Sequence, residues 1–180
     1  MEAIHLTITK KSIRCLAYLT FMVAGFSALA QDKTTASFII SGDVKVPVTV
    51  SIEDILKQKE ISIGDVTITN HLGEKKSESH GLKGVLLKDV LQLAEIKNEV
   101  PRLLSEYYFV CKASDKYTVV YSWNELYNSP TGDSAFIITE KNGKRIKDMD
   151  DSILMLSTKD FKTGRRHVKS LSSIEVKRAQ

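Results

Sequence analysis

An apolar run near the N-terminus sets the limits of the folded part of this chain. Residues 15–24 are apolar except for one threonine. That is long enough for the hydrophobic part of a secretory signal but shorter than the roughly 20 residues that span a bilayer. Basic residues precede the run: Lys10, Lys11 and Arg14. Ala28 to Ala30 then form the small-x-small pattern that a signal peptidase cleaves, so residues 1–30 are predicted to be a cleavable signal.

Cleavage leaves about 150 residues, a usual size for one domain, and the predicted domain covers residues 36–178. Hydrophobic residues make up 42% of the sequence, which argues against disorder. Cys111 is the single cysteine after the signal, so an intramolecular disulfide is excluded and stability must come from the core. We expect a periplasmic or secreted protein, of bacterial type from its Lys and Glu content, with no membrane span after cleavage.

Hydrophobic patterning predicts many short strands with a few helices between them. The strands are expected at residues 38–40, 44–50, 61–70, 107–111, 117–122, 135–139, 153–158 and 168–178, with a further return strand beginning at 145–147. The helices are expected from an N-cap at Ser51 to residue 59, over residues 84–96 and over residues 123–127. The polar stretch 71–83 is predicted to be a loop, and Asn142-Gly143 a two-residue turn. This mixture predicts a single α+β domain.

The sequence contains no spacing typical of a hydrolase triad, a zinc site, a P-loop or a dinucleotide-binding loop. His71, His80 and His167 stand apart from other ligand types, so no metal site is predicted and each is expected at the surface or in a hydrogen bond. One of them could act as a general base, but no orienting partner is identifiable. Cys111 lies in an apolar strand pattern and is expected to be buried and unreactive. Catalytic residues are left unassigned.

The segment from residue 162 to 169 concentrates charge in a chain whose net charge of +4 falls to about +2 without the signal. Its members are Gly164, Arg165, Arg166, His167 and Lys169, with Lys162 at its start. Arginine offers paired donors to an anion, lysine adds a point charge, and glycine lets the backbone approach closely. The segment is either a site for a small anion or a solvated basic loop. The low overall charge argues against a nucleic-acid partner.

Four segments follow one another in a familiar order. They are Gly42 to Asp54, Gly81 to Leu91 (GLKGVLLKDVL), Ala113 to Leu126 (ASDKYTVVYSWNEL) and Gly164 to Leu171 (GRRHVKSL). Together they resemble the oxidoreductase molybdopterin-binding domain, the catalytic fold of the sulfite oxidase family. The last segment is similar to the family's Gly-Ala-Arg-His-Val-Lys-Trp-Leu, which helps to hold the pterin. The resemblance implies a mixed-sheet α+β fold and a molybdenum–pyranopterin cofactor.

Family members ligate molybdenum through a cysteine thiolate, and here that position falls on Asn70 or His71. An amide or a neutral imidazole is a poor substitute for a soft thiolate. The cofactor contacts that the resemblance implies are Arg165, Arg166, His167, Lys169, Asn70 and His71. The resulting hypothesis is an exported protein of this fold that binds a pterin or another small anion without Cys-ligated molybdenum catalysis. The alternative is a cofactor-free module that holds a small ligand or a partner protein in the cell envelope.

Overall fold

The structure, a computed structural model, describes residues 35–98 and 100–179 of the 180-residue chain. The chain divides after Gln31, and the unit Asp32–Gln180 contains every described strand and helix. The expected signal peptide, residues 1–30, lies outside the described residues, so its cleavage stays a prediction. Within the described segments, no helix combines the length and the apolar character needed to cross a membrane.

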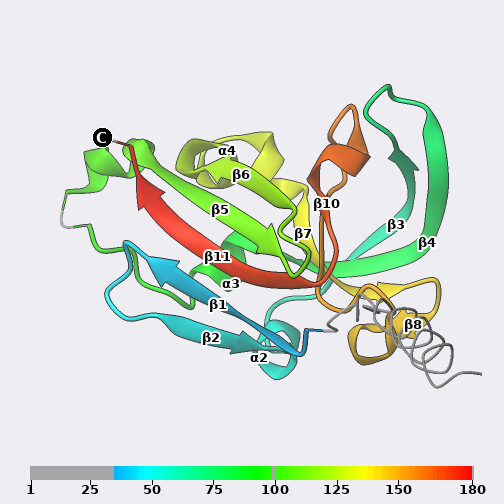
Figure 1. Ribbon diagram of the computed structural model, residues 1–180, viewed down its shortest axis with the longest axis horizontal. Helices are drawn as coiled ribbons and strands as arrows, with labels where there is room; N and C mark the ends of the chain where they lie inside the picture. Colours follow the sequence, from blue (N-terminus) through cyan, green and yellow to red (C-terminus); the bar gives the residue numbers. More distant parts are fainter. Residues whose placement is uncertain (1–34, 99, 180) are drawn as a thin grey trace, which may run out of the picture. The chain divides into compact units, whose positions relative to one another are not determined.

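One sheet has five strands and holds both the first and the last strand of the described chain (Figure 1). Its order is β2 (Val48–Ser51), β1 (Ser37–Gly42), β11 (Leu171–Arg178), β5 (Tyr107–Ala113) and β6 (Thr118–Ser122). β1 runs parallel to β11, whereas the other neighbours pair antiparallel. The sheet is therefore mixed, as expected.

The second sheet is antiparallel throughout. Its order is β10 (His167–Val168), β9 (Leu154–Ser157), β7 (Ala135–Lys141), β4 (Lys75–Leu86) and β3 (Ile61–Thr69), with β8 (Lys144–Arg145) paired to β7. The turn between β7 and β8 has φ of 52° at Asn142 and 77° at Gly143. Positive φ at both central residues is what a type I′ hairpin turn requires, so the predicted turn is confirmed.

The helices are single turns that link or cap the strands. They are α2 (Ile52–Leu56), α3 (Leu87–Leu91), α4 (Trp123–Tyr127) and the 3₁₀ turns η1 (Pro101–Glu106), η2 (Pro130–Asp133), η3 (Ile146–Asp148) and η4 (Thr163–Arg166). Ser51 caps α2 as predicted, because its hydroxyl accepts from the Asp54 N–H at 3.2 Å and its own N–H donates to the Asp54 carboxylate at 3.1 Å. Strands and short helices together confirm the α+β class.

Both sheets contribute to one hydrophobic core. Phe109 and Tyr121 enter it from the five-stranded sheet, and Ile137 and Leu156 from the antiparallel sheet. Along β5, buried residues alternate with half-buried ones, so this strand turns one face to the core. Cys111 lies on that inner face and is completely buried, which confirms the expectation from its apolar context.

Two sequence-based predictions in the middle of the chain are wrong. Of residues 71–83, expected to be a loop, 71–74 are a turn but 75–83 form most of β4, and the helix expected over residues 84–96 is reduced to α3 at Leu87–Leu91. Cross-strand pairing explains both errors, since Val85 pairs with Ile137 of β7 while the polar start of β4 pairs with β3. That polar start is exposed, so it lacks the alternation by which strands are recognised.

Candidate functional site

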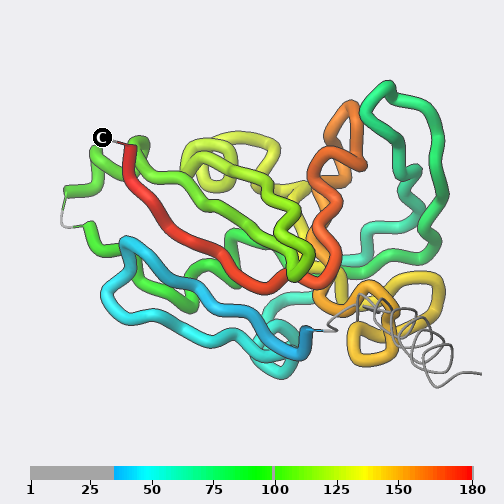
Figure 2. Tube along the Cα trace, viewed as in Figure 1, coloured from blue at the N-terminus to red at the C-terminus, as the bar shows by residue number. Residues whose placement is uncertain are grey.

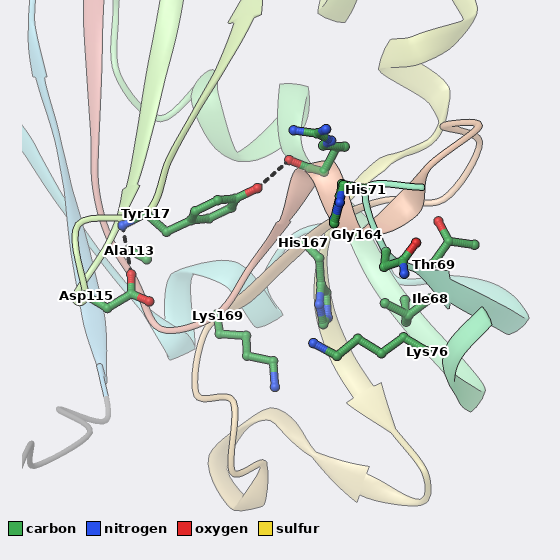
Figure 3. A pocket seen from close by; sticks show the side chains of 12 residues that line it. Ile68, Thr69, His71, Lys76, Ala113, Asp115, Tyr117, Gly164, His167 and Lys169 are labelled. Atoms are coloured by element: carbon green, nitrogen blue, oxygen red, sulfur yellow. Dashed lines mark hydrogen bonds between the residues drawn. The ribbon is translucent and has the colours of Figure 1, made fainter. Parts of the chain in front are cut away.

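A pocket of about 390 Å³ opens between the end of β3, the start of β4, the β5–β6 turn and the η4–β10 segment (Figure 3). It is lined by Ile68, Thr69, Asn70, His71, Lys76, Ala113, Asp115, Tyr117, Gly164, Arg165, His167 and Lys169. These residues come from three stretches that are far apart in the sequence. The lining gathers several charged side chains, among them Lys76, Asp115, Arg165 and Lys169.

Hydrogen bonds hold η4 in place as one wall of the pocket. The Thr163 hydroxyl accepts from the Thr69 N–H at 3.0 Å and donates to the Thr67 carbonyl at 2.8 Å, which ties η4 to the end of β3. From the other side, the Tyr117 hydroxyl donates to the Arg165 carbonyl at 2.7 Å. The wall is therefore positioned by both the β3–β4 hairpin and the β5–β6 turn.

The structure brings together five of the six residues that the sequence analysis singled out. Asn70, His71, Arg165, His167 and Lys169 all line the pocket. The residues of the pocket that the sequence analysis missed as ligand contacts are Thr69, Lys76, Asp115 and Tyr117. Asp115 and Tyr117 lie in the segment Ala113 to Leu126, whose resemblance to the sulfite oxidase family could have pointed to them as site residues. Lys76 had no such signal, because it lies in the stretch that was expected to be a loop.

Arg166, the sixth residue, does not line the pocket. Its side chain instead joins η4 to neighbouring parts of the protein. Its guanidinium donates to both carboxylate oxygens of Asp160, at 2.7 and 2.6 Å, and to Glu125 at 3.0 Å. It also lies over the Tyr121 ring, 4.4 Å from the centroid. The Asp160 carboxylate raises the pKa of this guanidinium above its ordinary value, so the charge is permanent. All of these contacts are within the protein.

Asn70 is engaged in closing its own turn. Its Nδ2 donates to Glu74 at 2.7 Å, and its Oδ1 accepts from the Leu72 and Glu74 N–H groups at 2.9 and 3.0 Å. This asparagine stabilises the β3–β4 turn at the pocket edge and has little remaining capacity for a ligand. The neighbouring His71 is exposed, and its carbonyl accepts from Lys162 Nζ at 2.8 Å.

His167 is the central polar group of the pocket. Its Nε2 is buried and has no hydrogen-bond partner among the residues that the structure describes, and the same holds for the Thr69 hydroxyl. Figure 3 shows the Lys76 side chain extended toward the His167 imidazole, with Lys169 on its other side. Burial and then the positive charge of Lys169 lower the pKa of His167 to about 4, so the ring is neutral at pH 7.

The charges around the pocket are mainly positive. Lys76 and Arg165 form no ion pair within the described part of the chain. Lys169 Nζ forms an ion pair with Asp151 Oδ1 at 2.7 Å, and Lys141 pairs with the other oxygen of the same carboxylate. Asp115 is the one carboxylate in the lining, and one of its oxygens already accepts from the Tyr117 N–H at 2.8 Å. The pocket therefore offers donors and positive charge to an incoming anion.

Acid is expected to destabilise the fold through His167. Because its pKa of about 4 lies below the 6.5 of an ordinary histidine, the native state binds fewer protons than the unfolded chain. The stability it contributes is complete above pH 6.5 and is lost as the pH falls toward 4. We expect this group to lower the free energy of unfolding by about 3 kcal/mol between neutral pH and the lower end of that window. Denaturant melts of the wild type and of His167→Gln measure the effect, and equal pH slopes in the two proteins would contradict it.

The donor set does not fit a thiolate-ligated metal. Cys111 is absent from the pocket lining, and complete burial raises the pKa of its thiol to about 12. No group of three or more His, Cys, Asp or Glu residues in the described segments is arranged to hold a metal ion. The neutral imidazole and the two lysines suit the oxygens of an anion better than a soft transition metal.

The fold has a counterpart among solved structures. Over 79% of its length the chain superposes on sulfane dehydrogenase SoxCD from Paracoccus pantotrophus, with a TM-score of 0.55 and 13% sequence identity. The two proteins share a fold. The likeness covers 38% of the sulfane dehydrogenase chain, and at this identity it concerns the architecture alone. No protein-family model matches the chain, and a search of curated proteins finds no relative.

Proposed function

We propose that this protein binds a small anionic ligand in the pocket around His167, on a sulfite-oxidase-type fold that lacks Cys-ligated molybdenum catalysis. The observation that carries the proposal is the pair of buried, unpartnered polar atoms, His167 Nε2 and Thr69 Oγ1, in a pocket with three cationic side chains. An unsatisfied buried polar group costs about 1–3 kcal/mol. A ligand oxygen that accepts from either atom after a local shift of the pocket side chains would remove part of that cost.

The charged side chains supply the attraction for such a ligand. Lys76 and Arg165 bring positive charge that no described carboxylate neutralises, and Lys169 adds a third cation at the opposite side. Charge-assisted hydrogen bonds from these groups are roughly twice as strong as neutral ones. The Asp115 carboxylate in the pocket lining repels ligands whose negative charge lies close to it. The same carboxylate can accept a hydrogen bond from an N–H or O–H group of the ligand.

The phosphate of a pyranopterin is one anion of this class, and the resemblance to the sulfite oxidase family supports it as a candidate. The pocket residues would bind and orient that phosphate, and the bound group would bring redox chemistry only if it carried a metal. The buried Cys111 favours the cofactor-free form, since no described thiol lies in the pocket to ligate molybdenum. The N-terminal sequence pattern supports action in the periplasm or outside the cell.

The test combines cofactor analysis with titration calorimetry. The full chain is expressed with its own N-terminal segment in a host that makes and exports the molybdenum cofactor, and the exported protein is purified. Molybdenum and pterin are then measured, and the protein is titrated with inorganic phosphate and with pyrophosphate. We expect little molybdenum and a measurable affinity for at least one of the anions. Lys76→Ala and Lys169→Ala should each weaken binding by about fivefold to tenfold.

Lys59→Ala is the matched control, since Lys59 is exposed and lies outside the pocket. It should bind as the wild type does. A correctly folded protein that shows no heat with either anion and carries no pterin would refute the proposed function. Near-stoichiometric molybdenum would refute the cofactor-free form and make His71 the first residue to change.

A further inference from the structure

Two loop tips lie side by side at the edge of the pocket. One is the β3–β4 turn, residues 70–74, and the other is the loop from residue 158 to 162 that leads into η4 (Figure 2). Lys162 Nζ donates to the His71 carbonyl at 2.8 Å, and a Cβ added at Gly73 would lie 3.9 Å from Lys162 Cε. The two tips therefore form one surface.

Each tip presents a large apolar side chain to solvent. Phe161 is fully exposed, and Leu72 is 64% exposed. Single apolar residues on a surface are common, but here two of them lie on neighbouring loops that hydrogen-bond to each other. Neither contributes to the core, so packing within the protein does not account for them.

Positive charge is concentrated on and next to the segments that carry these two side chains. Two nearby acidic residues are paired with cations, Glu78 of β4 with Lys75 and Asp160 with Arg166. Glu74 bonds only to the neutral amide of Asn70 and keeps its negative charge. Lys76, Lys159, Lys162 and Arg165 have no carboxylate partner in the described part of the chain. The tip surface, defined as Leu72, Phe161 and these four cations, therefore combines two exposed apolar side chains with a net positive charge, since its cations outnumber the one unpaired carboxylate among the described residues of the two loops, Glu74.

We propose that the tip surface docks on a lipid bilayer rich in anionic lipids, with Phe161 and Leu72 inserted at the boundary between headgroups and acyl chains. Basic side chains around exposed Phe and Leu are the combination that binds such membranes. A protein partner fits less well, because protein interfaces are depleted in lysine and three of the four cations are lysines. The argument does not use the ligand of the pocket, although Lys76 and Arg165 belong both to the pocket lining and to the tip surface.

Sedimentation with vesicles tests the proposal on residues 32–180. We expect binding to vesicles of phosphatidylglycerol and phosphatidylcholine, much weaker binding to phosphatidylcholine alone, and a loss of affinity as salt is added. Phe161→Ser should lower the partition coefficient by about tenfold, and Lys159→Ala by about fivefold. In Phe161→Trp, tryptophan emission should shift to the blue only with the anionic vesicles.

Val46→Ser is the matched apolar control, because Val46 is 68% exposed in the loop between β1 and β2, at the other end of the view in Figure 1. Lys59→Ala is the control for charge. Both should bind the vesicles as the wild type does. Folded protein that ignores anionic vesicles would overturn the proposal, as would Phe161→Ser with unchanged affinity. If saturating phosphate removes vesicle binding while Phe161→Ser does not, a headgroup in the pocket is responsible and the tip surface is not.

Discussion

Replacing Gly164 by alanine is expected to destabilise the domain by about 3 kcal/mol and to weaken anion binding by at least about tenfold. An added Cβ would lie 2.0 Å from the Thr69 carbonyl oxygen, which is a backbone atom that cannot swing away. Relief requires η4 to separate from β3, and this breaks the two hydrogen bonds of the Thr163 hydroxyl. The Gly164 φ is not positive, so steric contact is the cause and backbone strain is not.

Thermal melting and titration with pyrophosphate measure the two effects. A loss of about 3 kcal/mol in a domain of this size corresponds to a melting temperature lower by about 6–12 °C. Thr163→Val removes the hydrogen bonds without a new clash and should lie between Gly164→Ala and the wild type. Arg165→Ala alters an exposed side chain on the same turn and should melt as the wild type does. Wild-type melting and affinity in Gly164→Ala would show that η4 can move away from β3 without cost.

Removing the Arg166 side chain is expected to cost about 2–3 kcal/mol of stability. Its guanidinium is 19% exposed and joins the loop before η4 to Glu125, which is also part of the α4 capping box. In Arg166→Ala the Asp160 carboxylate, 17% exposed, would lose its charged partner while keeping one hydrogen bond from Ser157. Arg166→Lys should recover only part of the loss, since lysine cannot pair with both oxygens of a carboxylate.

A double-mutant cycle between Arg166→Ala and Asp160→Ala, followed by denaturant melts, measures the coupling directly. Arg178→Ala is the comparison, because Arg178 also brings two nitrogens to a carboxylate, both to one oxygen of Glu106 at 2.7 Å, but the pair is 42% exposed on each side and should contribute little. At a temperature where Arg166→Ala is folded, its affinity for pyrophosphate should stay within about threefold of the wild type. A severe loss of affinity in a stable Arg166→Ala protein would instead place this arginine in contact with the ligand.

The local sequence was sufficient for elements whose stabilising contacts are close along the chain. Ser51 and Asp54 satisfy each other's backbone groups over three residues, so the start of α2 could be predicted without tertiary information. The alternating pattern of β5 and the Asn142-Gly143 turn are local in the same sense. β4 was missed because its polar half is a strand only through pairing with β3, and its apolar half only through pairing with β7.

Some features of the candidate site could likewise be predicted from the local sequence, whereas others depended on the tertiary structure. The sequence alone identified the basic segment and the absence of a cysteine at the expected ligand position, since both are matters of residue type and order. Tertiary structure alone decided which of those groups face the pocket. Arg165, His167 and Lys169 line it, whereas Arg166, one position away, turns to Asp160 and Tyr121. Lys76 joins them from another strand. Side-chain direction depends on how η4 packs on β3, and that packing is set by contacts almost a hundred residues apart, such as the one of Thr69 with Thr163.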